Sequence, residues 1–215
     1  MPKQFQPYEA SPQVTGATAN EALYVDLTSA AHVTDIAADT QCKLQPGCRL
    51  INVKDIICSS WDQIEIALVN DVQRSVIYYS KVIITNLPYR GTARSYVWRS
   101  PCAEHATMLR EVAYKVPFNY LIRKYHLIIS DSHRNGEGRF EWHRKMSYAI
   151  HYNLNAHYYN RRISRLISIR TQDELNILTN QLWTSSNDEE PNLAIISTKP
   201  VYLDLIVASI SSHDF

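Results

Sequence analysis

Three segments that alternate apolar and polar residues follow one another in the first half of the chain. Ile and Leu alternate with Glu and Ala over residues 63–69, and Val, Ile and Tyr recur in residues 75–85 and 92–99. Asn70-Asp71 separates the first two segments, and a stretch with Pro and Gly over residues 87–91 separates the second from the third. Turn residues between segments of strand periodicity are typical of hairpins, so the sequence predicts three consecutive antiparallel strands.

A helix is predicted directly after the third strand. Ser100 suits the residue before a helix, Pro101 suits its first position, and apolar residues then recur at helical spacing. Pro117 should kink this helix or end it at Val116, because proline has no backbone N–H to donate. A second short helix to Tyr125 is expected to follow.

The second half of the chain alternates between strand and helix patterns. Residues 126–130 (HLIIS) are nearly all apolar, which predicts a strand buried on both faces near the centre of a sheet. The other expected elements are a loop over 131–138, a helix over 139–152, strands over 156–160 and 163–170, a helix capped by Thr171, a strand over 193–197 and an edge strand over 201–210.

The residues before the hairpin are less regular. About the first twenty contain three prolines and Gly16 and have no periodic apolar face, so an arm is predicted over residues 1–20. A helix is expected over residues 23–39, with Thr28 or Ser29 as a cap. The predicted fold class is α/β, with a single domain over residues 21–215 in which helices flank a mixed, largely antiparallel central sheet.

Charge is distributed unevenly, although the formal net charge of the 215 residues is only +1. Residues 110–170 carry 12 basic and 4 acidic side chains, whereas residues 171–215 carry 1 basic and 7 acidic side chains. A basic block of this kind attracts phosphate, and an acidic tail can also fold back and neutralise it. Both interpretations stay open at this stage.

The composition argues against several classes of protein. Hydrophobic residues make up 45% of the chain, which is enough apolar surface for a folded core. The amino terminus lacks the order of a signal peptide, and the longest apolar run near the end, residues 205–210, is too short for a bilayer. The four scattered cysteines are predicted to be reduced thiols. We therefore expect a cytoplasmic protein without a membrane partner.

The order of the predicted elements is a helix, three antiparallel strands, a helix, a buried strand, a helix and further strands. This order resembles the GCN5-related N-acetyltransferase fold over about residues 23–170, which leaves residues 171–215 as an extension. The residues similar to the family region in which a buried strand leads through an Asn-containing loop into the last helix are 128–131 (IISD), Asn135, Gly138, Phe140 and Trp142. Part of this set, with residues 96–101, is also similar to uncharacterised phage proteins of the same fold.

In that family, backbone amides of a loop before the main helix cradle the pyrophosphate of coenzyme A. The resemblance therefore implies acetyl-CoA or another acyl-CoA as cofactor, held by Arg99, Ser100, Cys102 and Asn135. The loop departs from the family pattern, because it has no glycine, Pro101 removes a donor and Glu104 adds a negative charge. Two interpretations follow: an active acyl-CoA-dependent N-acyltransferase, and a degenerate, non-catalytic relative.

The family mechanism needs a base for the acceptor amine and an acid for the leaving thiolate. A tyrosine of the last helix often supplies the acid in the family, which the resemblance places at Tyr148 or Tyr152. Glu65, on an early strand, is the candidate base. The competing explanation is that both tyrosines bury their rings in the core and keep their hydroxyls at its rim.

No metal site is predicted. Cys102 and His105 lie three residues apart on one predicted helix, which would make half of a metal site or a thiolate pair, but the sequence offers no evident second half.

Two alternatives to an acyltransferase stay open. Between residues 134 and 165, basic side chains alternate with tyrosines and Trp142, a mixture that single-stranded nucleic acid favours and that a core with a solvated rim also produces. The basic residues proposed for nucleic-acid binding are Arg134, Arg139, Arg144, Arg161 and Arg162. The other alternative is a virion or host-takeover protein that acts through protein contacts.

Overall fold

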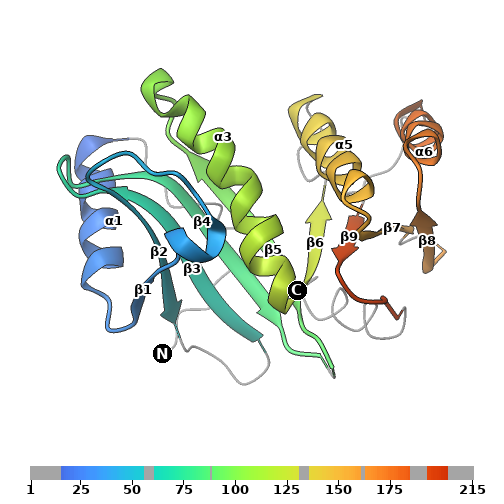
Figure 1. Cartoon of the computed structure of the whole chain (residues 1–215), viewed down its shortest axis with the longest axis horizontal. Coiled ribbons are helices and arrows are strands. Elements are labelled where there is room, and N and C mark those ends of the chain that lie inside the picture. Colours follow the sequence, from blue (N-terminus) through green and yellow to red (C-terminus); the bar gives the residue numbers. More distant parts are fainter. Residues whose placement is uncertain are drawn as a thin grey trace, which may run out of the picture. The chain divides into compact units, whose positions relative to one another are not determined.

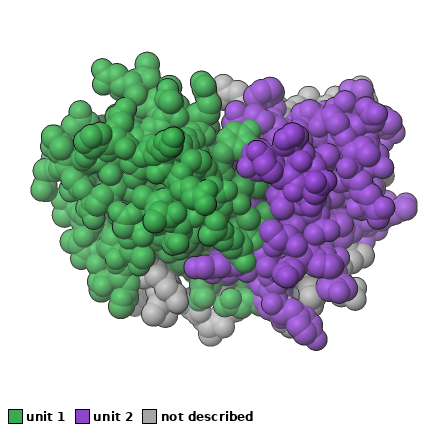
Figure 2. All heavy atoms as spheres, in the orientation of Figure 1, with its two compact units in different colours: residues 1–86, 93–123, 213–215 green, residues 87–92, 124–212 purple. Residues whose placement is uncertain are grey.

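The computed structural model describes residues 16–55, 61–87, 89–130, 136–160, 163–184 and 193–202. These residues form a mixed α/β structure of two compact units (Figures 1 and 2). Unit 1 contains the described residues up to 86 and residues 93–123, and unit 2 contains the described residues of 87–92 and those from 124 onward.

The sheet of unit 1 keeps its strands in chain order. The strands are β1 (Val33–Asp35), β2 (Cys48–Asp55), β3 (Trp61–Asn70), β4 (Ser75–Thr85) and β5 (Thr92–Arg99). The first four pair antiparallel, and the Ser100 amide just after β5 donates to the Ile77 carbonyl near the start of β4 (2.9 Å). The three antiparallel strands predicted between residues 63 and 99 are therefore confirmed.

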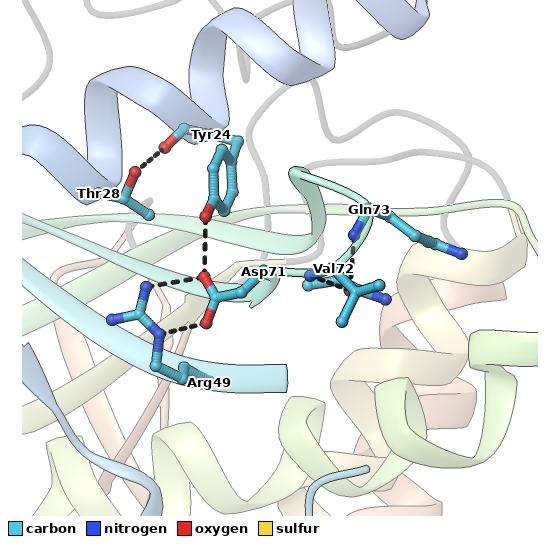
Figure 3. Close-up of polar contacts among 7 residues, drawn as sticks. Tyr24, Thr28, Arg49, Asp71, Val72 and Gln73 are labelled. Carbon is cyan, nitrogen blue, oxygen red and sulfur yellow. Dashed lines mark hydrogen bonds and ion pairs between the residues drawn. The ribbon is translucent and has the colours of Figure 1, made fainter. Parts of the chain in front are cut away.

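The turn between β3 and β4 is built by Asn70. Its side-chain oxygen accepts the amides of Val72 and Gln73, each at 3.0 Å, and Arg74 closes the turn with a φ of 49° (Figure 3). Asparagine favours this geometry because its side chain imitates a backbone acceptor. The predicted turn at Asn70-Asp71 is confirmed.

Helical segments cover both faces of this sheet. On one face, Tyr24 and Leu27 of α1 (Ala17–Ser29) pack against a cluster that includes Val53 of β2. Asn52 points to the opposite face, because side chains alternate along a strand, and its amide donates to the Tyr120 hydroxyl at 2.9 Å. Tyr120 belongs to η2 (Val116–Leu121), a turn of π-helix after α3 (Ala106–Lys115).

The predicted helix over residues 23–39 was wrong in extent. The helix α1 runs from Ala17, inside the predicted arm, to Ser29, and β1 and α2 (Ala37–Thr40) follow. Thr28 and Ser29 are not N-terminal caps, because their hydroxyls donate to carbonyls of the last turn of α1. The strand β2, which pairs with both β1 and β3, was not predicted.

The helix after β5 begins later than predicted. Cys102 is still extended (φ −66°, ψ 124°), and a 3-10 turn, η1 (Ala103–His105), comes before α3. Around Pro117 the prediction holds, because α3 ends at Lys115 and the chain continues as η2 and the short helix α4 (Ile122–Lys124).

Unit 2 has a four-strand sheet whose order differs from the chain order. The order is β6 (His126–Ser130), β9 (Leu193–Ser197), β7 (Asn155–Asn160) and β8 (Arg165–Ile169), and each neighbouring pair is antiparallel. All four strands were predicted. The strand β9 lies in the interior of this sheet although the resemblance stops at residue 170.

Two helices, α5 (Gly136–His151) and α6 (Gln172–Thr184), complete unit 2. Trp142, Met146 and Ala149 are fully buried, as the apolar face of the predicted helix requires. The helix α5 starts earlier than predicted, and residues 136–138 are helical rather than loop.

The helix α5 ends where the sequence predicts, because Asn153 adopts a φ of 54° and the Leu154 amide donates to the Ala149 carbonyl. The predicted cap of α6 is also confirmed. The Thr171 hydroxyl accepts the Glu174 amide and the Glu174 carboxylate accepts the Thr171 amide, each at 3.2 Å.

Residues 1–15 of the predicted arm and residues 203–210 of the predicted edge strand lie outside the described residues, and 201–202 are not in a strand. The proposed division into an arm, a domain and an extension stays a prediction.

Candidate functional site

The turn between β5 and η1 is closed by its own side chains. The Ser100 hydroxyl oxygen accepts the Cys102 amide at 3.2 Å and lies 3.2 Å from Nδ1 of His105. The His105 amide donates to the Cys102 carbonyl at 3.1 Å. Ser100, which the helix prediction treated as a cap of the main helix, therefore acts one turn earlier.

This closed turn is where the resemblance places the cofactor pyrophosphate. A phosphate cradle needs backbone N–H groups that are available to an anion. Here the Cys102 amide already has an acceptor and Pro101 has no N–H, while Glu104 exposes a carboxylate close by. Arg99, on the last position of β5, is exposed and supplies the positive charge of this turn. Asn135 lies outside the described residues.

Cys102 is an exposed free thiol, and Cys42 and Cys48 are free thiols as well. Burial raises the pKa of both Cys42 and Cys48, which lowers their thiolate fraction at neutral pH. Among the described residues, no group of three or more His, Cys, Asp or Glu side chains could hold a metal ion.

Glu65, the candidate base, has a fixed partner in unit 1. It lies on β3 opposite Val53 of β2 and Lys81 of β4, and the buried Tyr79 donates its hydroxyl to the Glu65 carboxylate. Tyr79 belongs to the cluster that packs under α1, so this hydrogen bond places Glu65 on the α1 face of the sheet. Glu65 is therefore half-buried, and its carboxylate already has a hydrogen-bond donor within its own sheet.

Of the candidate acids, Tyr148 lies on the last turn of α5 in unit 2, and Tyr152 follows directly after the end of that helix. Their ring centroids are 4.3 Å apart, and the His151 ring approaches Tyr152 edge-on at 4.9 Å. Tyr152 is 56% exposed and Tyr148 is half-buried, so the two rings form a pair at the surface and are not part of the core. The alternative that both rings are buried in the core is wrong for Tyr152, which is exposed, and only partly correct for Tyr148, which is half-buried.

The basic and aromatic segment separates into buried rings and partly exposed charges. Trp142, Tyr158 and Tyr159 are at most 5% exposed, so their faces are not available to stack on bases. Arg144 forms an ion pair with Glu141 at 2.6 Å and lies over the exposed Phe140 ring. Arg134, Arg161, Arg162 and the side chain of Arg139 lie outside the described residues.

A buried polar group in unit 2 was missed by the sequence argument. The register of β6, β9 and β7 aligns His126, Ser197 and Asn155 in one row on one face, with His157 two residues further along β7. His126 is 6% exposed and Ser197 is fully buried, and Nδ1 of His126 lies 2.7 Å from the Ser197 hydroxyl oxygen. We call these four residues the histidine cluster.

Ser197 is the centre of the histidine cluster. Its hydroxyl oxygen also accepts the Lys199 amide at 3.0 Å, and its carbonyl accepts the Asn155 side-chain amide at 3.3 Å. Burial, with the nearby positive charge of Arg90, lowers the pKa of His126 to about 4. Burial also lowers the pKa of His157, so both rings are neutral at pH 7.

A second polar network, in unit 1, was also missed. Arg49 donates two hydrogen bonds to the Asp71 carboxylate (2.5 and 2.8 Å), and the Tyr24 hydroxyl donates to the same group at 2.9 Å. Figure 3 shows both side chains pointing at Asp71. The Arg49 guanidinium lowers the pKa of Asp71, and the bond to Asp71 raises that of Tyr24. This network ties α1 to β2 and to the turn after β3.

These two groups share a reason for having been missed. Each joins residues that are far apart in the chain, such as positions 24, 49 and 71, and none stands in a recognised motif. Only the pairing of strands brings their side chains together.

The chain matches no known family model, no curated protein and no solved structure in the three comparisons. No helix in the described part of the chain is long and apolar enough to cross a bilayer.

Proposed function

We propose that this chain is a degenerate, non-catalytic relative of the acyltransferases it resembles, and that it acts through binding rather than through acyl transfer. The observation that carries the proposal is the closed turn before η1. There the Ser100 hydroxyl accepts the Cys102 amide, which is one of the donors that a pyrophosphate would need.

Electrostatics supports the same conclusion. A helix start attracts anions through its unpaired N–H groups and its partial positive charge. Pro101 removes one donor, and the exposed Glu104 carboxylate adds a negative charge that repels a phosphate at close range.

The order of elements supports the acyltransferase-like scaffold. The strands β3, β4 and β5 are followed by α3, β6, α5 and β7, which is the order on which the resemblance rests. A scaffold of this order with a closed cofactor turn is expected of a protein that has kept the fold and lost the cofactor.

Calorimetric titration with acetyl-CoA tests the proposal. The wild-type protein should give no binding at millimolar cofactor. The double variant Pro101→Gly with Glu104→Gln restores a donor and removes the repelling charge, so it should gain measurable affinity. Asp26→Asn is the matched control, because it removes one exposed carboxylate of unit 1 elsewhere and should leave binding absent.

Two outcomes contradict the proposal. Micromolar binding by the wild-type protein would restore the enzyme interpretation, in which Tyr148, Tyr152 and Glu65 become the first residues to substitute. Absence of binding by a folded double variant would mean that the turn is not a lost cofactor site, and the acyltransferase-like scaffold would lose its main support.

A second candidate function is binding of single-stranded nucleic acid. The observation that favours it is a pair of exposed rings: Phe140 on α5, with Arg144 over its face, and Tyr152 just after the end of α5. Exposed rings beside cations can stack on bases.

Fluorescence anisotropy with a mixed oligonucleotide at several salt concentrations tests this second function. If it is correct, affinity should fall steeply with salt, and Phe140→Ala and Tyr152→Ala should each weaken binding at least about fivefold. Val72→Ala, which removes an exposed apolar side chain of unit 1, is the control and should change nothing. A flat salt dependence would exclude this function.

A further inference from the structure

The histidine cluster of unit 2 contains one buried titratable ring, His126, and one half-buried ring, His157. His126 is 6% exposed, and Nε2 of His157 is buried and has no hydrogen-bond partner among the described residues. Their surroundings are apolar, because Ile128 and Ile195 of the same face belong to a buried cluster with Tyr159 and Leu193. A charged imidazolium in such surroundings is costly unless it gains a carboxylate.

Protonation would disturb the hydrogen bonds around Ser197. In the neutral state the Ser197 hydroxyl can donate to Nδ1 of His126 while it accepts the Lys199 amide. A protonated ring has two N–H donors and no acceptor, so the Ser197 proton must turn away inside a fully buried site. As a result, the hydrogen bonds of Ser197, which lies between His126 of β6 and Asn155 of β7, become weaker.

The charged groups that act on the two rings are positive. Arg90 and His157 act on His126, and Arg170 acts on His157. Arg90 also donates to the Tyr125 carbonyl at 3.1 Å, next to His126. Lys199 follows β9 and contacts Ser197 through its amide. Protonation would therefore add positive charge to an already positive environment, and the described contacts of the two rings include no carboxylate.

We propose that the histidine cluster is an acid-sensitive switch, in which protonation of His126 and His157 opens the β6, β9 and β7 end of the unit 2 sheet. The switch goes beyond the proposed function, and it does not depend on whether acyl-CoA binds.

The direction of the effect follows from the two states. The pKa of His126 is about 4 in the folded sheet, and an exposed histidine has a pKa near 6.5. Above pH 6.5 neither state binds the proton, and the full stability of the sheet is present. Between pH 6.5 and 4 only the open state binds it, so stability falls as the pH falls through this window.

Hydrogen–deuterium exchange between pH 7.5 and 5, corrected for the intrinsic exchange rate, tests the switch. For the strands β6 and β9, the equilibrium constant for opening should rise about twentyfold from pH 7 to pH 5 if His126 alone takes up one proton. The strands β2 and β3 of unit 1 are the internal reference, and their protection should stay nearly constant.

His126→Gln keeps a hydrogen-bonding side chain that does not titrate, so it should remove most of this pH dependence. The double variant with His157→Gln should remove the rest. His32→Gln, at an exposed position of unit 1, is the matched control and should keep the wild-type profile.

Titration of the histidine ring protons by NMR in the wild-type protein gives an independent result that does not require the variants to fold. His126 should titrate below pH 5 or only together with opening. A normal titration of His126 near pH 6.5 in the closed sheet, or equal protection of β6 and β9 at pH 7 and pH 5, would overturn the switch.

Discussion

The two units bury their sheets in different ways. In unit 1, α1 packs on one face, η2 packs on the other, and the interior residues such as Leu50, Ile66 and Leu68 are apolar and fully buried. In unit 2, the apolar cluster of one face contains, among the residues that the structure describes, none from α5 or α6, and the same face carries the histidine cluster. In unit 1, the charged network of Arg49, Asp71 and Tyr24 lies at a partly exposed turn. In unit 2, the neutral polar side chains of His126 and Ser197 are buried.

Because the polar network of unit 1 is partly exposed and that of unit 2 is buried, we expect the two units to respond differently to acid and salt. The ion pair of Arg49 with Asp71 is partly exposed, so water and salt screen it and its loss costs little. The contact of His126 with Ser197 is buried, so a change of protonation there is expensive. Mild acid should therefore act on unit 2 first, and only stronger acid on the unit 1 network.

The largest expected effect is that of Trp142→Ala in α5. Trp142 is fully buried in unit 2, and its truncation leaves a cavity that should cost about 3–5 kcal/mol of the free energy of unfolding. Denaturant unfolding measures the loss, and hydrogen exchange shows which strands open. Phe140→Ala, on the exposed side of the same helix, should cost less than about 0.5 kcal/mol.

Ile66→Ala in β3 is the counterpart in unit 1. Ile66 is fully buried in the sheet between α1 and η2, so we expect a loss of about 2–4 kcal/mol. Exchange should rise in β2, β3 and β4, while the histidine cluster of unit 2 keeps its neutral-pH protection. Equal loss of protection in β6 and β9 would show that the two units unfold as one cooperative block.

Asp71→Asn should cost about 1 kcal/mol at pH 7, because it removes the partner of Arg49 and Tyr24 at a partly exposed site. The pKa of Asp71 is lowered in the fold, so its contribution is present above pH 4 and is lost as the pH falls below that value. Thermal unfolding at pH 7 and pH 3 should therefore show a difference between wild type and variant at pH 7 that shrinks at pH 3. Glu21→Gln, in an exposed pair with Arg74, is the control and should cost less.

Gly47→Ala, before β2, should have an effect of about the same size as Asp71→Asn, through backbone strain instead of lost hydrogen bonds. Gly47 has a φ of +80°, and a Cβ there would lie 2.8 Å from Cγ2 of Val72. The left-handed backbone makes alanine unfavourable by about 1 kcal/mol, although the exposed Val72 side chain can move. Gly16→Ala is the matched control, since nothing lies within 4 Å of its added Cβ and its φ is −135°. Equal stability of both variants would show that the turn before β2 is not under backbone strain.

Much of the local structure could be predicted from residue patterns. The strands β5, β6 and β9 appear at the predicted residues, because alternation or continuous hydrophobicity between turn residues is a strong local signal. Capping by Thr171 and Glu174 was predictable for the same reason. The failures lie where local preference and tertiary pairing disagree. Val33 and Thr34 are β-branched residues that favour a strand, and they join β1 because β2 offers them a partner, although the surrounding Ala-rich sequence predicted a helix.

The candidate site residues were predicted much less well. Glu65 has Tyr79 as a partner, and Ser100 has Cys102 and His105, so each of these side chains has a local role that residue type does not reveal. Trp142 was proposed both as a core residue and as part of a stacking surface, and its complete burial decides for the core.

The amino-acid sequence alone specified most of the strands and helices from β3 onward, because turn, cap and periodicity signals act over a few residues. Tertiary packing decided which of these segments lie side by side. It placed β9 between β6 and β7, and it brought His126, Ser197 and His157 into one buried cluster. Such contacts join residues up to 71 positions apart, and their energy exists only after the sheet has formed, so no local pattern in the chain encodes them.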